Sequence, residues 1–338
     1  MAELQDRLDI TVEDLEERLG NRKLEDFIKQ SEELFLKRTK NAIEEACNNR
    51  QIKAVFISGP TSSGKTTFTM HLAEGLSKAG RQAAFLSLDD YYKLTDLTFD
   101  KDGRPDFETI ETLDLERANS DIKRILNGES VCPPRFNFMT RQSEERDPSE
   151  AVSIPEDGVL VVEGLHGLNK RVSGDLDDSS VIKIFIMPYG NVYCDTKLMD
   201  SNEIRLLRRI VRDYRHRAAH ALSTIDYWPM IEKSEEAYYV DYLSAATYHI
   251  NSFLAYESLV IAPLALHDIK EALEQVSSKR IEPSIFMAKS NKNKPFADLS
   301  KALNRARKLV EHLEKIPVCD PSRVPDDSIL LEFIGKDS

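Results

Sequence analysis

A nine-residue run near position 60 constrains the fold more than any other part of this sequence. It reads Gly59-Pro60-Thr61-Ser62-Ser63-Gly64-Lys65-Thr66-Thr67 and matches the pattern of Gly, any four residues, Gly-Lys-Ser/Thr. The apolar residues 53–58 before it indicate a buried strand, and residues 68–76 after it have helical spacing. A strand, a glycine-rich turn and a helix in this order predict a phosphate-binding loop. The alternative is a glycine-rich turn that merely precedes an ordinary helix.

The residue types in this run suit a nucleoside triphosphate. Gly59 and Gly64 allow a tight turn that points several N–H groups into one concavity. The start of the following helix adds its positive end, which favours bound phosphate. We expect the run to bind ATP, with Lys65 on the β- and γ-phosphates and Thr66 on Mg²⁺. The expected ATP contacts in the run are Gly59, Thr61, Ser62, Ser63, Gly64, Lys65, Thr66 and Thr67.

Composition excludes several classes of protein. The chain has 338 residues, 41% apolar and 31% charged, which is typical of a globular protein with a full core. A net charge of −12 argues against a general nucleic-acid binder, although a local basic pocket remains compatible with it. We expect no membrane span and no secretory leader, because apolar runs are short and the first residues are polar. Four widely spaced cysteines predict reduced thiols and a cytoplasmic protein.

The order of apolar segments predicts an α/β fold, a three-layer sandwich of the P-loop NTPase type. Its mainly parallel sheet would carry a helical lid and helical extensions at both ends. We expect a helical N-terminal extension over 1–50, an α/β domain with the phosphate loop over 51–276, and a C-terminal helical extension with a docking tail over 277–338. A short strand is also expected at 258–261.

Acidic residues follow two of the predicted strands. Asp89 and Asp90 come after the strand at 82–88, and Glu163 ends the strand that begins at Val159. Ligands of open α/β sheets bind at the carboxyl ends of strands, so these acids are well placed for chemistry or a metal. The alternative is that they cap turns and helices.

A basic helical stretch over 202–221 is unusual in so acidic a chain. It holds Arg205, Arg208, Arg209, Arg212, Arg215, His216 and Arg217. One interpretation is a lid whose arginines clamp a triphosphate and stabilise charge during transfer. The other is a solvated helix face paired with Glu and Asp.

These segments together resemble the uridine kinase and phosphoribulokinase family of P-loop kinases, and most closely its bacterial-type uridine kinase-like nucleoside kinases. The resemblance covers about residues 55–265 and rests on motifs in this order: residues 58–67, Ser87-Leu88-Asp89-Asp90-Tyr91-Tyr92, Val162-Glu163-Gly164-Leu165-His166-Gly167, and Arg208-Arg209-Ile210-Val211-Arg212-Asp213. The C-terminal Ser-Ile-Leu…Glu-Phe-Ile-Gly tail is also similar. The resemblance implies ATP-dependent phosphorylation of the 5′-hydroxyl of a nucleoside.

The resemblance also implies roles for individual residues. The expected catalytic residues are Asp89, Lys65 and Arg212; the metal residues are Thr66, Asp89 and Glu163; Arg208 and Arg212 belong to the lid over ATP. The acceptor would contact Asp89, Tyr92, Glu108, Phe136 and Arg141. Uridine–cytidine kinases have Asp, Tyr and His where this chain has Glu108, Phe136 and Arg141, so the implied acceptor is less firm than the reaction.

Three functions therefore remain open. The first is a nucleoside kinase that uses ATP and Mg²⁺, and the second is a kinase of a sugar phosphate or another small alcohol. The third is an ATP-binding regulatory module without transfer activity. In each case we expect a small-molecule partner and neither nucleic acid nor membrane, and the sequence leaves a homo-oligomer open.

Overall fold

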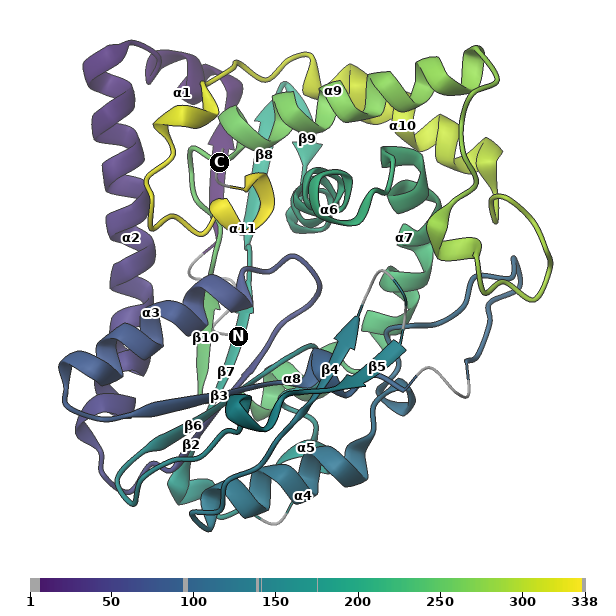
Figure 1. The fold of residues 1–338 in the computed structure, drawn as a ribbon. Helices are drawn as coiled ribbons and strands as arrows, with labels where there is room; N and C mark the ends of the chain where they lie inside the picture. The colour runs from purple at the N-terminus through teal and green to yellow at the C-terminus, as the bar shows by residue number, and fades with distance from the viewer. Residues whose placement is uncertain (1–6, 94–96, 138–139, 141, 175, 336–338) are drawn as a thin grey trace.

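A parallel sheet forms the centre of the molecule (Figure 1). The computed structural model describes residues 7–93, 97–137, 140, 142–174 and 176–335. In this part of the chain, five strands form the sheet in the order β10-β7-β2-β6-β3, and every neighbouring pair is parallel. The strands are β2 (Ala54–Ser58), β3 (Ala83–Ser87), β6 (Val159–Glu163), β7 (Val181–Met187) and β10 (Tyr248–Asn251). The predicted α/β class is therefore confirmed.

The central strands are buried on both faces, as expected for a parallel sheet between helical layers. Side chains of β2 alternate between two cores, because successive residues of a strand point to opposite faces. Val55 and Ile57 belong to one core, and Ala54 and Phe56 belong to the other. The sheet is thus the middle layer of a three-layer arrangement.

Helices cover the two faces of the sheet. On one face, α3 (Lys65–Lys78) packs against the long α2 (Asn21–Asn48). The other face carries α4 (Leu115–Leu126), α5 (Lys170–Ser173) and α8 (Tyr239–Ala245). In Figure 1, α4 and α5 lie on the opposite side of the sheet from α3.

A second group of helices lies beyond the carboxyl end of the sheet. It consists of α6 (Ser201–Arg217), α7 (Ala221–Glu236), α9 (Ser258–Ser277) and α10 (Leu299–Leu313), which pack against one another (Figure 1). Beside them a small sheet joins β1 (Leu8–Thr11), β8 (Gly190–Cys194) and β9 (Thr196–Met199), and α1 (Val12–Glu17) follows β1. This group places the basic helix α6 opposite the strand ends.

Two local predictions were wrong. The N-terminal segment is not helical throughout, because residues 8–11 form β1 and pair in parallel with β8. Residues 258–261 begin helix α9 rather than a strand. A short apolar run fits a buried strand and a buried helix equally well, and distant pairing partners decide between them.

The C-terminal tail docks on the domain, as predicted. The side chains of Ile329, Leu330 and Phe333 are fully buried, and the tail ends in the short helix α11 (Leu331–Ile334). A hairpin of β4 (Pro134–Asn137) and β5 (Gln142–Glu145) projects near the turn after β3. Among the described residues, no helix has the length and apolar character required to cross a membrane. The division at residues 50 and 276 stays a prediction.

Candidate active site

The predicted phosphate loop connects β2 to α3 and depends on its glycines. A Cβ at Gly59 would lie 2.1 Å from the carbonyl oxygen of Ile186, so a larger residue does not fit there. Gly64 has a φ of +92°, which favours glycine, and directly precedes α3. No side chain caps this end of α3, so its first N–H groups remain available for an anion.

Two hydroxyl groups of the loop are available to a ligand. Within the described residues, the buried hydroxyl groups of Ser62 and Ser63 have no hydrogen-bond partner. The Lys65 Nζ donates to the carbonyl oxygens of Gly59 at 3.0 Å and Pro60 at 3.2 Å, which holds its charge beside the loop. Unpartnered hydroxyl groups, free N–H groups and a lysine fit a bound phosphate chain.

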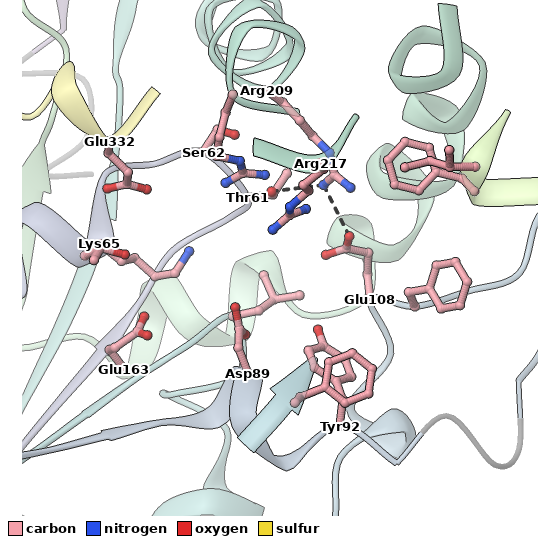
Figure 2. A pocket seen from close by; sticks show the side chains of 17 residues that line it. Thr61, Ser62, Lys65, Asp89, Tyr92, Glu108, Glu163, Arg209, Arg217 and Glu332 are labelled. Carbon is pink, nitrogen blue, oxygen red and sulfur yellow. Dashed lines mark hydrogen bonds and ion pairs between the residues drawn. The ribbon is translucent and has the colours of Figure 1, made fainter. Parts of the chain in front are cut away.

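A cavity of about 180 Å³ opens in front of this loop (Figure 2). Of the predicted ATP residues, Thr61, Ser62, Lys65, Thr66 and Arg212 line it, while Gly59, Ser63, Gly64, Thr67 and Arg208 do not. The complete lining is Thr61, Ser62, Lys65, Thr66, Asp89, Tyr92, Phe107, Glu108, Phe136, Glu163, Leu165, Arg209, Arg212, Arg217, Ile285, Phe286 and Glu332.

Asp89 and Glu163 come together at the floor of the cavity, because β3 and β6 are neighbours in the sheet. Ser87 pairs with Glu163 across these strands, and its hydroxyl donates to Glu163 at 2.6 Å. Burial and then repulsion by Asp89 raise the pKa of Glu163 to about 7. Burial also raises the pKa of Asp89, against the opposing charge of Lys65. Burial is the largest cause of both shifts, because a charged carboxylate is less stable away from water.

Asp90 has a different environment from its neighbour. Its carboxylate accepts from Arg146 at 2.5 Å and from the backbone N–H of Phe136 at 3.3 Å. Asp90 therefore fastens the β4–β5 hairpin, and it is absent from the cavity lining. Of the two adjacent acids, Asp89 is the one that faces the cavity.

Helix α6 presents three arginines to the cavity, the last of them at its final residue. Arg209, Arg212 and Arg217 line it, and each contacts the fully buried Asp213, at 3.1, 3.3 and 3.4 Å. Burial acts to raise the pKa of Asp213, but these arginines outweigh it and keep that pKa below its usual value. Burial and the nearby Arg217 lower the pKa of Arg212 to about 10. Asp213 thus holds several like charges close together.

Arg208 requires a correction. Its guanidinium group is fully buried and pairs with Glu257 at 2.6 Å, so it does not reach over a nucleotide. It also donates to the carbonyl oxygens of Ser62 at 3.2 Å and Ser252 at 2.8 Å. Arg208 therefore supports the phosphate loop from behind. Arg209, which was not among the predicted ATP contacts, faces the cavity instead.

Aromatic side chains surround the other end of the cavity. Tyr92 and Phe136, two of the expected acceptor contacts, lie with ring centroids 5.5 Å apart, and Phe107 also lines the cavity. Glu108 points toward Arg209, with which it forms a 3.4 Å ion pair (Figure 2). Arg141, the remaining predicted acceptor contact, lies outside the described residues.

Buried His166 fixes the segment that carries Glu108. Its Nε2 is 2.8 Å from the carbonyl oxygen of Glu108, and its Nδ1 is 2.7 Å from the hydroxyl of Tyr242. Burial lowers the pKa of His166 to about 4, so the ring is neutral near pH 7. A neutral imidazole between two partners is an orienting group.

The C-terminal extension contributes lining residues that sequence reasoning missed. Ile285 and Phe286 close the aromatic end, and Phe286 stacks on Tyr227 with centroids 4.8 Å apart. Glu332 enters from the tail at the phosphate-loop end (Figure 2). The apolar pattern of the tail predicted docking but carried no signal for its location.

The predicted metal residues fit a hard cation in chemical type. Thr66, Asp89 and Glu163 all line the cavity and offer the oxygen ligands that Mg²⁺ prefers. Among the described residues, no group of three or more His, Cys, Asp or Glu side chains is arranged as a metal site by itself. This agrees with the usual Mg²⁺ site of kinases, which is completed by substrate phosphates and water.

The chain is similar to several known proteins. Uridine kinase from Leuconostoc citreum (strain KM20) is 29% identical over 172 residues, which cover 50% of this chain and 72% of that protein. A solved structure described as a possible uridine kinase from Bacillus stearothermophilus has a TM-score of 0.37 and 15% identity, over 63% of this chain and 98% of the other.

A candidate fructose transport system kinase from Silicibacter sp. TM1040 has a TM-score of 0.36 and 19% identity, over 55% of this chain and 85% of that one. The profile of the Phosphoribulokinase / Uridine kinase family matches residues 54–253, which include the phosphate loop, both floor acids and all of α6. The chain therefore belongs to the Phosphoribulokinase / Uridine kinase family of kinases.

Proposed function

We propose that this protein transfers the γ-phosphoryl group of ATP to the 5′-hydroxyl of a nucleoside. The observation that carries the proposal is the position of Asp89, between the phosphate loop and the aromatic end of one cavity. An acid at this point can meet a hydroxyl group that faces the terminal phosphate of a bound nucleotide.

In the proposed reaction, a bond forms between the acceptor oxygen and the γ-phosphorus. The bond from that phosphorus to the bridging oxygen of ADP breaks, and Asp89 takes the proton of the hydroxyl group late in the step. The raised pKa of Asp89 suits this proton transfer, because a base works best when its pKa approaches the working pH.

The arginines and Lys65 would supply positive charge to the phosphate oxygens in the transition state. Arg212 and Arg217 line the cavity from α6 and its end, and Lys65 lies across from them on α3 (Figure 2). Bound Mg²⁺ would neutralise further phosphate charge, with Thr66, Asp89 and Glu163 as its protein-side oxygen groups. The fixed positions of these groups would do most of the catalytic work.

The aromatic end favours a nucleoside over a sugar phosphate. Tyr92, Phe107, Phe136 and Phe286 offer flat apolar surfaces on which a base can stack. A sugar phosphate would require free positive charge there, but Arg209 is already paired with Asp213 and Glu108. A kinase of a small alcohol remains the second candidate, because the family includes phosphoribulokinases.

The test is transfer of labelled phosphate from ATP to a panel of nucleosides and sugar phosphates, with wild type and two variants. Asp89→Asn should reduce kcat by roughly 10² to 10⁴ and leave the Kd for ATP nearly unchanged. Asp90→Asn is the matched control, since it removes the same charge one residue away and outside the cavity lining. Its effect should fall on the KM for the acceptor, because Asp90 holds the hairpin that carries Phe136.

Each outcome decides between the candidates. Transfer to nucleosides supports the proposal, and transfer to a sugar phosphate alone replaces it with the second candidate. Full turnover by Asp89→Asn removes Asp89 from the role of base. Binding of ATP without transfer to any acceptor favours a regulatory module instead.

A further inference from the structure

The C-terminal tail, residues 328–335, is built into the phosphate end of the cavity. The Cδ1 of Ile329 lies 2.1 Å from the position that a Cβ on Gly64 would take, so the two residues are in tight contact. Ile329 is fully buried, and α11 packs against α6 (Figure 1). The tail is therefore packed against the domain beside the cavity.

A second contact joins the tail to the phosphate loop through Arg208. The Arg208 guanidinium lies 4.9 Å from the ring centroid of Phe333, a cation–π arrangement in a fully buried setting. The same guanidinium donates to the carbonyl oxygen of Ser62. Phe333 and Ile329 thus bracket the one side chain of the tail that lines the cavity, Glu332.

Glu332 has an unmet hydrogen-bonding requirement. Its Oε2 atom is buried, and no group in the described part of the chain donates to it. In Figure 2 its carboxylate points toward the space beside Lys65, across that lysine from Glu163. A buried carboxylate oxygen without a donor is costly, so a ligand that brings a donor gains binding energy there.

The chemistry of the site restricts what that donor can be. Phosphate oxygens of a nucleotide only accept hydrogen bonds at neutral pH, and they repel a carboxylate. The O–H donors nearest to a bound phosphate chain are the ribose hydroxyl groups and the water molecules on its metal ion. Glu332 lines the cavity beside Lys65, the first residue of α3 (Figure 2). A nucleotide bound at the phosphate loop would bring these donors to the same end of the cavity.

We propose that Glu332 is a nucleotide-binding residue that accepts a hydrogen bond from an O–H donor of the bound magnesium nucleotide. The donor is a ribose hydroxyl group or a metal-bound water molecule. This inference rests on the proposed use of ATP and adds the C-terminal tail to the nucleotide site. Ile329 and Phe333 are positioning residues that hold Glu332 in place.

The experiment measures nucleotide binding by titration calorimetry, without an acceptor, for wild type and Glu332→Gln. The variant keeps the shape of the side chain but loses its charge, and we expect the Kd for magnesium ATP to rise about tenfold. Asp327→Asn is the matched control, because it removes the same charge from an exposed position on the same segment. It should bind like wild type, and thermal unfolding should show that both variants remain folded at the temperature of the titration.

Two further arms identify the donor. If it is a ribose hydroxyl group, the Glu332→Gln defect persists in EDTA and disappears with 2′-deoxy-ATP or 3′-deoxy-ATP. If it is metal-bound water, the defect disappears in EDTA and persists with both deoxy nucleotides.

Equal or tighter binding by Glu332→Gln overturns this inference alone, because wild type still binds ATP. Failure of wild type to bind ATP overturns the proposed function together with it.

Discussion

Asp213 provides the sharpest test of how the arginines of the cavity are held. Its side chain is fully buried. Its oxygens accept hydrogen bonds from Arg209 at 3.1 Å and Arg212 at 3.3 Å, and they form an ion pair with Arg217 at 3.4 Å. The variant Asp213→Asn keeps the size of the side chain but removes the negative charge and one acceptor atom. It removes the counter-charge that these three guanidinium groups share, while Arg209 keeps its ion pair with buried Glu108.

The magnitude follows from the burial of this cluster. Breaking a buried ion pair by removing one partner costs about 3 to 5 kcal/mol. The asparagine oxygen still accepts one hydrogen bond, so we expect a loss near the lower end, about 3 kcal/mol. For a chain of this size, that loss lowers the Tm by roughly 4 °C. Splayed arginines should also raise the KM for ATP, because their charges no longer converge on the phosphates.

Asp268→Asn is the matched control for Asp213→Asn. Asp268 of α9 is also buried and pairs at 3.2 Å with Arg215, which belongs to α6 like the cavity arginines. Neither Asp268 nor Arg215 lines the cavity. The control should lose stability without a change in the KM for ATP. Urea unfolding and steady-state kinetics measure both effects. The reasoning is refuted if Asp213→Asn unfolds within about 0.5 kcal/mol of wild type, or if both variants have the same kinetics.

Three further predictions concern the rest of the cavity. The raised pKa of Glu163, about 7 against 4.5, means that the folded state binds more protons between these values. The free energy of unfolding of the nucleotide-free protein should therefore fall as the pH rises from about 5 to 8, and it should fall less for Glu163→Gln. Urea unfolding in EDTA at several pH values measures this difference. Gly64→Ala should lower the free energy of unfolding by roughly 1 to 3 kcal/mol, because alanine is strained at a φ of +92° and its Cβ meets Ile329. An unchanged Tm would contradict this prediction. Phe286→Ala should raise the KM for the acceptor about tenfold and leave the KM for ATP unchanged, because it removes apolar surface at the aromatic end. A raised KM for ATP with an unchanged KM for the acceptor would place Phe286 at the nucleotide.

The parts of the site that sequence reasoning predicted are local in the chain. The phosphate loop is a contiguous run whose glycines and lysine each have a steric or electrostatic reason to be there. Asp89 and Glu163 were predicted because they end apolar strands, and parallel strands bring such ends to one edge of a sheet. The contiguous loop motif and the apolar pattern of the strands were therefore enough to predict the α/β class and most of the phosphate-loop end of the cavity.

The parts that sequence reasoning missed depend on packing between distant segments. A run of arginines on α6 does not reveal which of them faces the cavity, because this depends on how the helix is rotated between α7 and α9. Arg208 accordingly points to Glu257 and Arg209 to the cavity. Phe286 comes from a segment with no motif, and the tail that carries Glu332 resembles the family without indicating where it docks. Only tertiary contacts bring both residues to the site.

The contact between Gly64 and Ile329 also bears on the order in which the protein becomes functional. These residues are about 265 positions apart, so their meeting closes one of the longest loops that this chain can form. Contacts of such long range tend to form late in folding, after local helices and neighbouring strands. During synthesis, the sheet and α3 can fold before residue 329 has left the ribosome. Competence to hold a nucleotide should then arise last, when the tail reaches the loop.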